Sequence, residues 1–93
     1  MALRAKGRET ITTTDELRRT VEEAFRVSMH TDLNVVRRLC LLAEQENGKK
    51  RAHHVQLAEK AFASALELAS RVELNQDDRE AIERAQDNIH QLG

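Results

Sequence analysis

The sequence has no proline, and its three glycines stand at positions 7, 48 and 93. A β-rich domain needs turn residues roughly every 8 to 12 positions, so this scarcity excludes that class and predicts an all-α chain. Tryptophan and tyrosine are also absent, which leaves Phe25 and Phe62 as the only aromatic residues. Modules that bind single-stranded nucleic acid stack bases on aromatic rings, so we do not expect a nucleic-acid partner.

A single cysteine, Cys40, excludes an intramolecular disulfide. Together with the lack of a signal-peptide pattern, this predicts a cytoplasmic protein. No apolar run approaches the roughly 20 residues that a membrane-spanning helix needs, so we do not expect a membrane protein. The 15 Lys and Arg residues nearly balance the 16 Asp and Glu residues, for a formal net charge of −1. This balance provides no overall attraction to nucleic acid or to a membrane surface.

The apolar pattern predicts one helical domain, residues 14–93, after a flexible N-terminal arm, residues 1–13. The arm mixes small and basic residues without periodicity. In the domain, apolar residues recur at spacings of three and four, which is typical of amphipathic helices. The predicted helices cover about 14–29, 32–47, 50–74 and 76–92. Because the connections are short, we expect a small antiparallel bundle of about four helices.

Local signals support these boundaries. Thr31 or Asp32 is expected to cap the second predicted helix, and Gly48 is expected to end it in the left-handed conformation. Asn75 is a good N-cap for the last helix. The acidic residues that follow it, Asp77 and Asp78, suit the positive end of the helix dipole, and we interpret them as solvated capping charges.

The second and third predicted helices are apolar on more than one side, so a single neighbour cannot cover them. The apolar residues beside their main seams are Val35, Leu39, Leu42, Leu57 and Leu68. We expect these side chains to mediate self-association into a homodimer or a larger homo-oligomer.

The third predicted helix is the longest, and it starts with the densest basic cluster of the chain. This cluster consists of Lys49, Lys50, Arg51, His53 and His54. Cations are mildly disfavoured at a helix N-terminus, which already has a partial positive charge. Two interpretations stay open. The cluster is either a solvated overhang of the bundle, offset by Glu44 and Glu46, or a docking site for a phosphate or an acidic protein surface.

His53 and His54 are also compatible with a signalling role. Histidine-containing phosphotransfer domains are small four-helix bundles in which an exposed helical histidine carries the phosphoryl group, and this chain is similar to them in length and class. Those domains have a lysine three positions after the histidine and then a small residue. Here His54 is followed by Leu57 and Ala58, so only the small-residue half of the pattern is met. The resemblance implies a phosphotransfer function as an alternative.

A second resemblance concerns residues 58–69, AEKAFASALELA. The small, aromatic and small residues Ala58, Phe62 and Ala65 make this stretch similar to the second helix of a tetratricopeptide repeat. No second copy occurs at a 34-residue period, and an alanine-rich seam explains the same residues. The resemblance implies a scaffold fragment as a further alternative.

Catalytic machinery is not indicated. No two histidines have the i, i+4 spacing that places two metal ligands on one helix face. The serines lie on or beside packed helix faces, where no base and orienting group converge with them. We therefore expect no enzymatic activity, no cofactor and no metal site. The sequence predicts a cytoplasmic helical adaptor or regulatory module that self-associates and docks an acidic or phosphorylated protein at residues 49–54.

Overall fold

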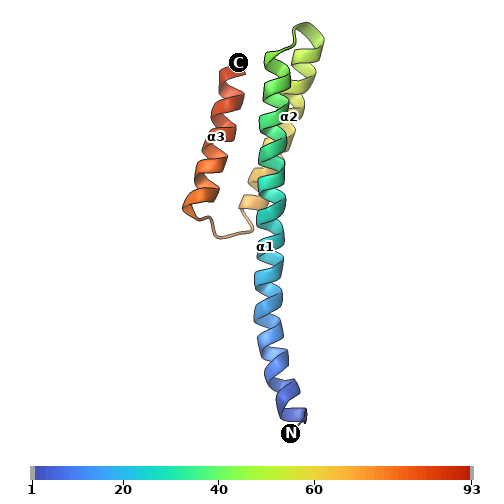
Figure 1. Cartoon of the computed structure of the whole chain (residues 1–93), viewed down its shortest axis with the longest axis vertical. Helices are drawn as coiled ribbons and strands as arrows, with labels where there is room; N and C mark the ends of the chain where they lie inside the picture. Colours follow the sequence, from blue (N-terminus) through green and yellow to red (C-terminus); the bar gives the residue numbers. More distant parts are fainter. Residues whose placement is uncertain (1, 93) are drawn as a thin grey trace.

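The computed structural model describes the backbone of residues 2–92 and the side chains of residues 14–92. The described residues form three helices: α1 (Ala2–Glu44), α2 (Gly48–Ala69) and α3 (Gln76–Leu92). The first two form an antiparallel hairpin, and α3 runs back beside α1 (Figure 1). The predicted N-terminal arm, residues 1–13, lies outside the residues whose side chains are described.

The all-α class is confirmed, but the prediction of about four helices is wrong. The two helices predicted for 14–29 and 32–47 are parts of the single helix α1. The helix predicted for 50–74 corresponds to α2, which begins two residues earlier and ends at Ala69. The last predicted helix, 76–92, is confirmed as α3.

The two predicted caps near residue 31 serve other purposes, which explains why α1 continues. Thr31 Oγ1 donates a hydrogen bond to the Val27 carbonyl at 2.9 Å, an i to i−4 bond that fits inside a helix. Asp32 instead accepts a hydrogen bond from Ser64 Oγ of α2 at 2.7 Å. With neither proline nor glycine in this stretch, nothing breaks the backbone ladder.

A tight reversal joins α1 to α2. The amides of Gln45 and Glu46 bond three residues back, to the carbonyls of Leu42 and Ala43 at 3.1 and 3.2 Å. Gly48 has a φ of +66°, so the left-handed conformation predicted for it is confirmed. It does not end α1, which stops at Glu44, but is the first residue of α2. A side chain at that φ would be strained, whereas glycine adopts it readily.

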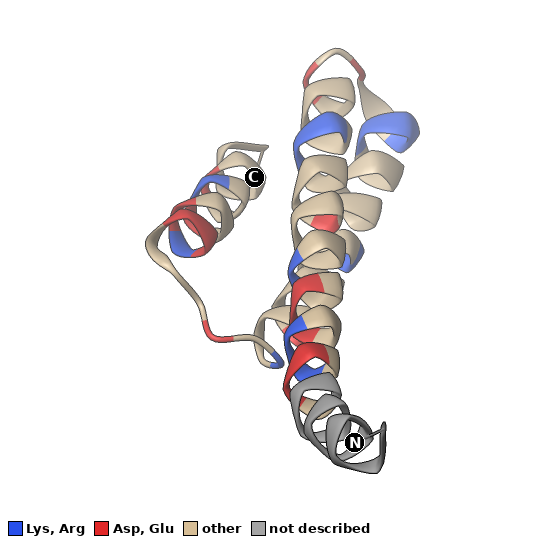
Figure 2. Ribbon diagram, turned by 60° about the horizontal axis from the view of Figure 1, so that its bottom comes forward, with Lys and Arg blue, Asp and Glu red and all other residues tan. Residues whose placement is uncertain are grey.

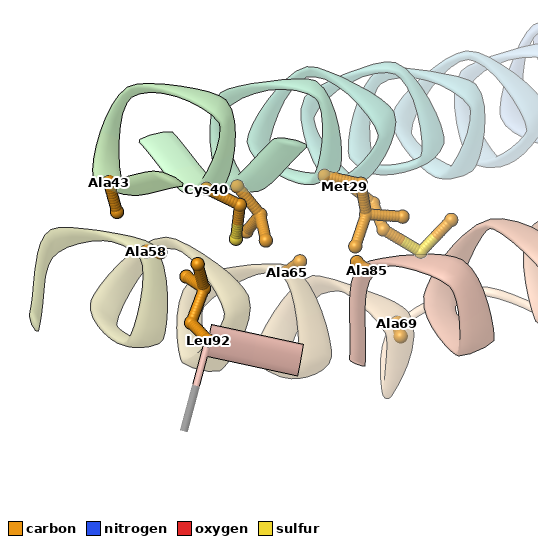
Figure 3. Close-up of a cluster of buried hydrophobic side chains, with 10 residues drawn as sticks. Met29, Cys40, Ala43, Ala58, Ala65, Ala69, Ala85 and Leu92 are labelled. Atoms are coloured by element: carbon orange, nitrogen blue, oxygen red, sulfur yellow. The ribbon is translucent and has the colours of Figure 1, made fainter. Parts of the chain in front are cut away.

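The hydrophobic core is a narrow seam shared by the three helices (Figure 3). Its buried members are Met29, Leu33, Val36, Cys40 and Ala43 of α1, Ala58, Ala65 and Ala69 of α2, and Ala85 and Leu92 of α3. Half of these residues are alanines, which allow the helices to approach closely but bury little apolar area each. The core is therefore small for the length of the chain.

The molecule is elongated, with principal extents of 69 × 23 × 16 Å and a radius of gyration of 18.8 Å. A compact domain of this length would have a radius of about 12 Å. The longest helix is α1, with 43 residues against 22 in α2, and its N-terminal part extends past the other helices (Figure 1). The basic start of the third predicted helix, in contrast, lies beside the end of α1, so the overhang named in one of its two interpretations is not found (Figure 1).

Candidate functional site

The basic cluster begins α2 at the end of the molecule where α1 and α3 terminate (Figure 1). Helix C-termini have a partial negative charge and unpaired carbonyls, so cations are favoured beside them. Arg51 supplies two bonds of this kind. Its Nη2 donates to the Leu92 carbonyl at 2.8 Å, and its Nη1 donates to the Ala43 carbonyl at 3.4 Å. The neighbouring helix ends therefore offset the unfavourable position of this cation on its own helix.

The other members of the cluster divide into outward and inward side chains. Lys49, Lys50 and His53 are exposed, and neither lysine side chain makes a hydrogen bond or ion pair with any residue whose side chain is described. His54 is half-buried, and its Nδ1 lies 2.9 Å from Glu46 Oε1. The two atoms are within ion-pair distance, although the Nδ1 geometry is not that of a hydrogen bond. Figure 2 shows this basic start of α2 next to acidic residues of the connection.

A second polar site joins α1 to the start of α3, and its centre is Asp78. This side chain is only 1% exposed. Arg26 Nε donates to Asp78 Oδ2 at 3.1 Å, and His30 Nε2 lies 2.7 Å from Oδ1. The backbone amide of Asn75 donates to Oδ2 at 3.1 Å, while the amide of Asp78 donates to Asn75 Oδ1 at 2.8 Å. These two reciprocal bonds form a capping box at the start of α3.

Burial and hydrogen bonding have opposite effects on Asp78. Burial alone raises the pKa of this carboxyl, but the bonds from His30, the Asn75 amide and Arg26 outweigh it and lower the pKa below the ordinary 3.8. The hydrogen bond to Asp78 in turn raises the pKa of the Arg26 guanidinium, although desolvation opposes this shift. Asp78 is therefore held as a carboxylate and Arg26 as a cation.

The same network reaches the connection between α2 and α3. Arg26 Nη2 donates to the Glu73 carbonyl at 2.7 Å, and the Glu73 amide donates to Glu22 Oε1 at 3.0 Å.

Asp78 was predicted as a solvated capping charge. The capping role is confirmed, whereas its solvation is wrong because α1 covers it. The sequence signal for the cap, Asn75 followed three residues later by an acid, was present. Nothing in the sequence marked the two residues of α1 as its partners.

An open polar groove of about 460 Å³ lies between α1 and α3. Its polar lining comes from His30, Asn34, Arg37, Asp77, Arg84 and Asn88.

Among the described residues, no group of three or more His, Cys, Asp or Glu side chains is placed to hold a metal ion. The same residues include no helix that is both long and apolar enough to cross a bilayer. Cys40 is free and buried, and burial, together with the nearby Glu44 charge, raises the pKa of its thiol.

The five predicted self-association residues share one side of the α1–α2 hairpin. The hydrogen bond between Asp32 and Ser64 marks this side. On α1, Val35, Leu39 and Leu42 follow Asp32 by three, seven and ten positions, which places them along the same face. On α2, Leu57 and Leu68 precede and follow Ser64 by seven and four positions. Helix α3 lies on another side of α1, where it binds Arg26 and His30.

These five residues differ in how far the chain itself covers them. Val35 and Leu42 are 40% and 45% exposed. Leu39, Leu57 and Leu68 are half-buried, and both Leu39 and Leu68 also pack against the core. The predicted residues therefore line the border between the core and the solvent.

The exposed apolar row continues along α1 toward its N-terminus. Leu17, Val21 and Val27 are 58%, 51% and 57% exposed. Val21 precedes Val35 by 14 positions, or two heptads, so the two side chains lie on one face. We call the complete surface the open face: Leu17, Val21, Val35, Leu39 and Leu42 of α1 with Leu57 and Leu68 of α2. Val27 lies beside this face, two heptads from Leu41. The N-terminal half of the open face was not identified from the sequence.

Comparisons with protein-family models, with curated proteins and with solved structures found no match to this chain. Functional arguments for it therefore rest on its own residues.

Proposed function

We propose that this chain is a non-enzymatic helical interaction module that self-associates through the open face. One observation carries the proposal: four large apolar side chains of α1, each at least 40% exposed, line up on one face of the helix over about seven turns. These side chains are Leu17, Val21, Val35 and Leu42. Scattered exposed apolar residues are ordinary on a monomer, whereas a continuous apolar stripe is typical of an interaction site.

The exposed area supports the same proposal. The chain exposes 7219 Å², whereas a compact monomer of 10.6 kDa exposes about 5,500 Å². The excess of about 1,700 Å² is larger than the roughly 800 Å² that each partner buries in a standard protein interface. A second helical layer on the open face would bring the chain closer to the exposure of a compact protein.

The outward part of the basic cluster is proposed as a docking point for an acidic or phosphorylated protein partner. Lys49, Lys50 and His53 are exposed beside the free amides at the start of α2. Charge at such a site sets orientation and association rate more than affinity. A fluorescent glutamate-rich peptide, with and without phosphoserine, should bind the wild type and lose binding in K49E/K50E. Equal binding by both proteins would remove this part of the proposal.

Phosphotransfer through His54 is not part of the proposal. The side chain is only 23% exposed, and its Nδ1 lies 2.9 Å from a carboxylate oxygen of Glu46. The negative charge would repel an incoming phosphoryl group. A tetratricopeptide-like scaffold is also left out, because the paired helices occur once in the described residues.

Self-association is tested by measuring molar mass against concentration, using light scattering and sedimentation equilibrium. The matched variants are Leu42→Ser on the open face and Leu66→Ser on the opposite side of α2, since these leucines are 45% and 44% exposed. Covering the exposed half of a leucine contributes about 1 kcal/mol, and Leu42 occurs once in each copy. Leu42→Ser should therefore weaken a dimer by about 2 kcal/mol, or roughly 30-fold. Leu66→Ser should match the wild type.

A strictly monomeric wild type at high concentration would refute the proposed self-association. Equal weakening by the two serine variants would show that the open face is not the interface.

A further inference from the structure

We propose that two copies pair through α1 in antiparallel orientation, about a two-fold axis that passes near Val27 and Ser28. This inference rests on the proposed self-association and adds the partner surface and its register. The open face of each copy is then covered by the open face of the other. The N-terminal half of α1 in one copy packs against the C-terminal half of α1 in its partner.

The spacing along α1 supports a long helix-to-helix seam. Thr14, Val21, Ser28, Val35 and Leu42 follow one another at intervals of seven residues. Leu17 lies between Thr14 and Val21, and Ala24 lies between Val21 and Ser28, at intervals of three and four residues. A seven-residue repeat keeps one stripe facing a partner helix over many turns. From residue 14 to 42 this seam is about 42 Å long at 1.5 Å per residue.

The distribution of apolar bulk along the seam favours the antiparallel orientation. Its large side chains occur near both ends, while Ala24 and Ser28 occupy the middle. In the proposed register, Val21 of one copy faces Val35 of the other, and Leu17 faces Leu39. The N-terminal half of α1 extends past α2, whereas α2 flanks the C-terminal half (Figure 1). Each extending half would therefore become a fourth helix beside the partner's hairpin.

The charges on the edge of the seam distinguish the two orientations. Glu16 and Arg38 are both exposed on α1. Arg38 shares the heptad position of Leu17 and Ala24, and Glu16 lies further out on that side of the seam. The antiparallel register brings Glu16 of one copy opposite Arg38 of the other, and the symmetry produces this pair twice. A parallel, in-register dimer would instead place Arg38 opposite Arg38 and Glu16 opposite Glu16. Facing charges of opposite sign favour a register, and like charges disfavour it.

Cysteine crosslinking in a Cys40→Ala background tests the register. The variants are Ser28→Cys, Val21→Cys and Val35→Cys, with Leu41→Cys as a control because Leu41 is 51% exposed on another face of α1. Each is treated with a short bifunctional maleimide after circular dichroism has shown wild-type helicity. Light scattering on the same samples reports the oligomeric state.

Ser28→Cys should crosslink with itself, because the two-fold axis brings both copies of residue 28 together. Val21→Cys and Val35→Cys should crosslink only when the two chains are mixed, since the two copies of residue 21 lie about 20 Å apart along the seam. Leu41→Cys should stay uncrosslinked. We expect the mixed sample to yield at least tenfold more covalent dimer than either chain alone.

Other outcomes separate this inference from the function on which it rests. Self-crosslinking of Val21→Cys and of Val35→Cys would indicate a parallel dimer and overturn the register. A dimer by light scattering without any of the expected crosslinks would also overturn the register, while self-association itself would stand. A monomer at all concentrations would overturn both proposals.

Discussion

Replacing Asp78 by asparagine tests the polar network that fastens α3 to α1. The side chain is 1% exposed and accepts from Arg26, His30 and the Asn75 amide. Asparagine keeps the shape but presents an NH₂ group to one of these donors. Breaking a buried ion pair costs about 3–5 kcal/mol. Because the side chains of Arg26 and His30 both retain contact with water, we expect a smaller loss of about 2 kcal/mol. Total stability for 93 residues is about 5–14 kcal/mol, so the loss is a large share.

The measurement is urea unfolding followed by circular dichroism. With a slope of about 1–2 kcal/mol/M, the midpoint should fall by about 1–2 M while the slope stays unchanged. Asp77→Asn is the matched control, because Asp77 belongs to the same helical turn but is exposed. It loses only a favourable interaction with the helix dipole, about 0.5 kcal/mol.

The pH dependence gives an independent check with a defined sign. The pKa of Asp78 is lower in the folded chain than its ordinary 3.8. Its ionised form therefore stabilises the fold fully above pH 4, and this stability is lost as the pH falls through the lower, folded value. The stability difference between wild type and Asp78→Asn should be constant near neutral pH and shrink below about pH 4. A loss no greater than that of Asp77→Asn at pH 7 would refute this account of the network.

Two further predictions concern single side chains. Arg51→Met should lower the stability by about 1–2 kcal/mol, because the Leu92 carbonyl loses its side-chain donor and the Ala43 carbonyl keeps only the Glu46 amide. Lys50→Met, at an exposed position, should change the stability by less than about 0.5 kcal/mol. Equal melting temperatures for the two variants would contradict the role of Arg51. Cys40 should react with a thiol reagent at least about a thousandfold more slowly in buffer than in concentrated urea, because its side chain is 3% exposed and burial raises the pKa of its thiol. Reaction rates within tenfold of each other in the two solutions would mean that the α1–α2 seam opens readily.

Local features were readable from the sequence because they depend on residues close together in the chain. The scarcity of glycine and proline indicated helices, and the left-handed conformation at Gly48 and the cap at Asn75 followed from backbone chemistry at single positions. The bounds of α3 were also predicted, since its cap and apolar stripe agree. The alignment of Val35 with Leu39 and Leu42 on one face followed from helical periodicity alone.

Tertiary contacts decided the remaining features. Whether α1 stops near Thr31 depended on Asp32, whose carboxylate could cap a helix locally but instead binds Ser64 of α2. Asp78 has the sequence context of a solvated first-turn acid, and only the packing of α1 over it brings Arg26 and His30 within bonding distance. Arg51 likewise occupies a poor position on its own helix and a favourable one beside two helix C-termini. The local sequence determined that these segments are helical. Their charged and capping side chains acquired partners only when the helices packed together, because those partners are up to 52 residues away along the chain.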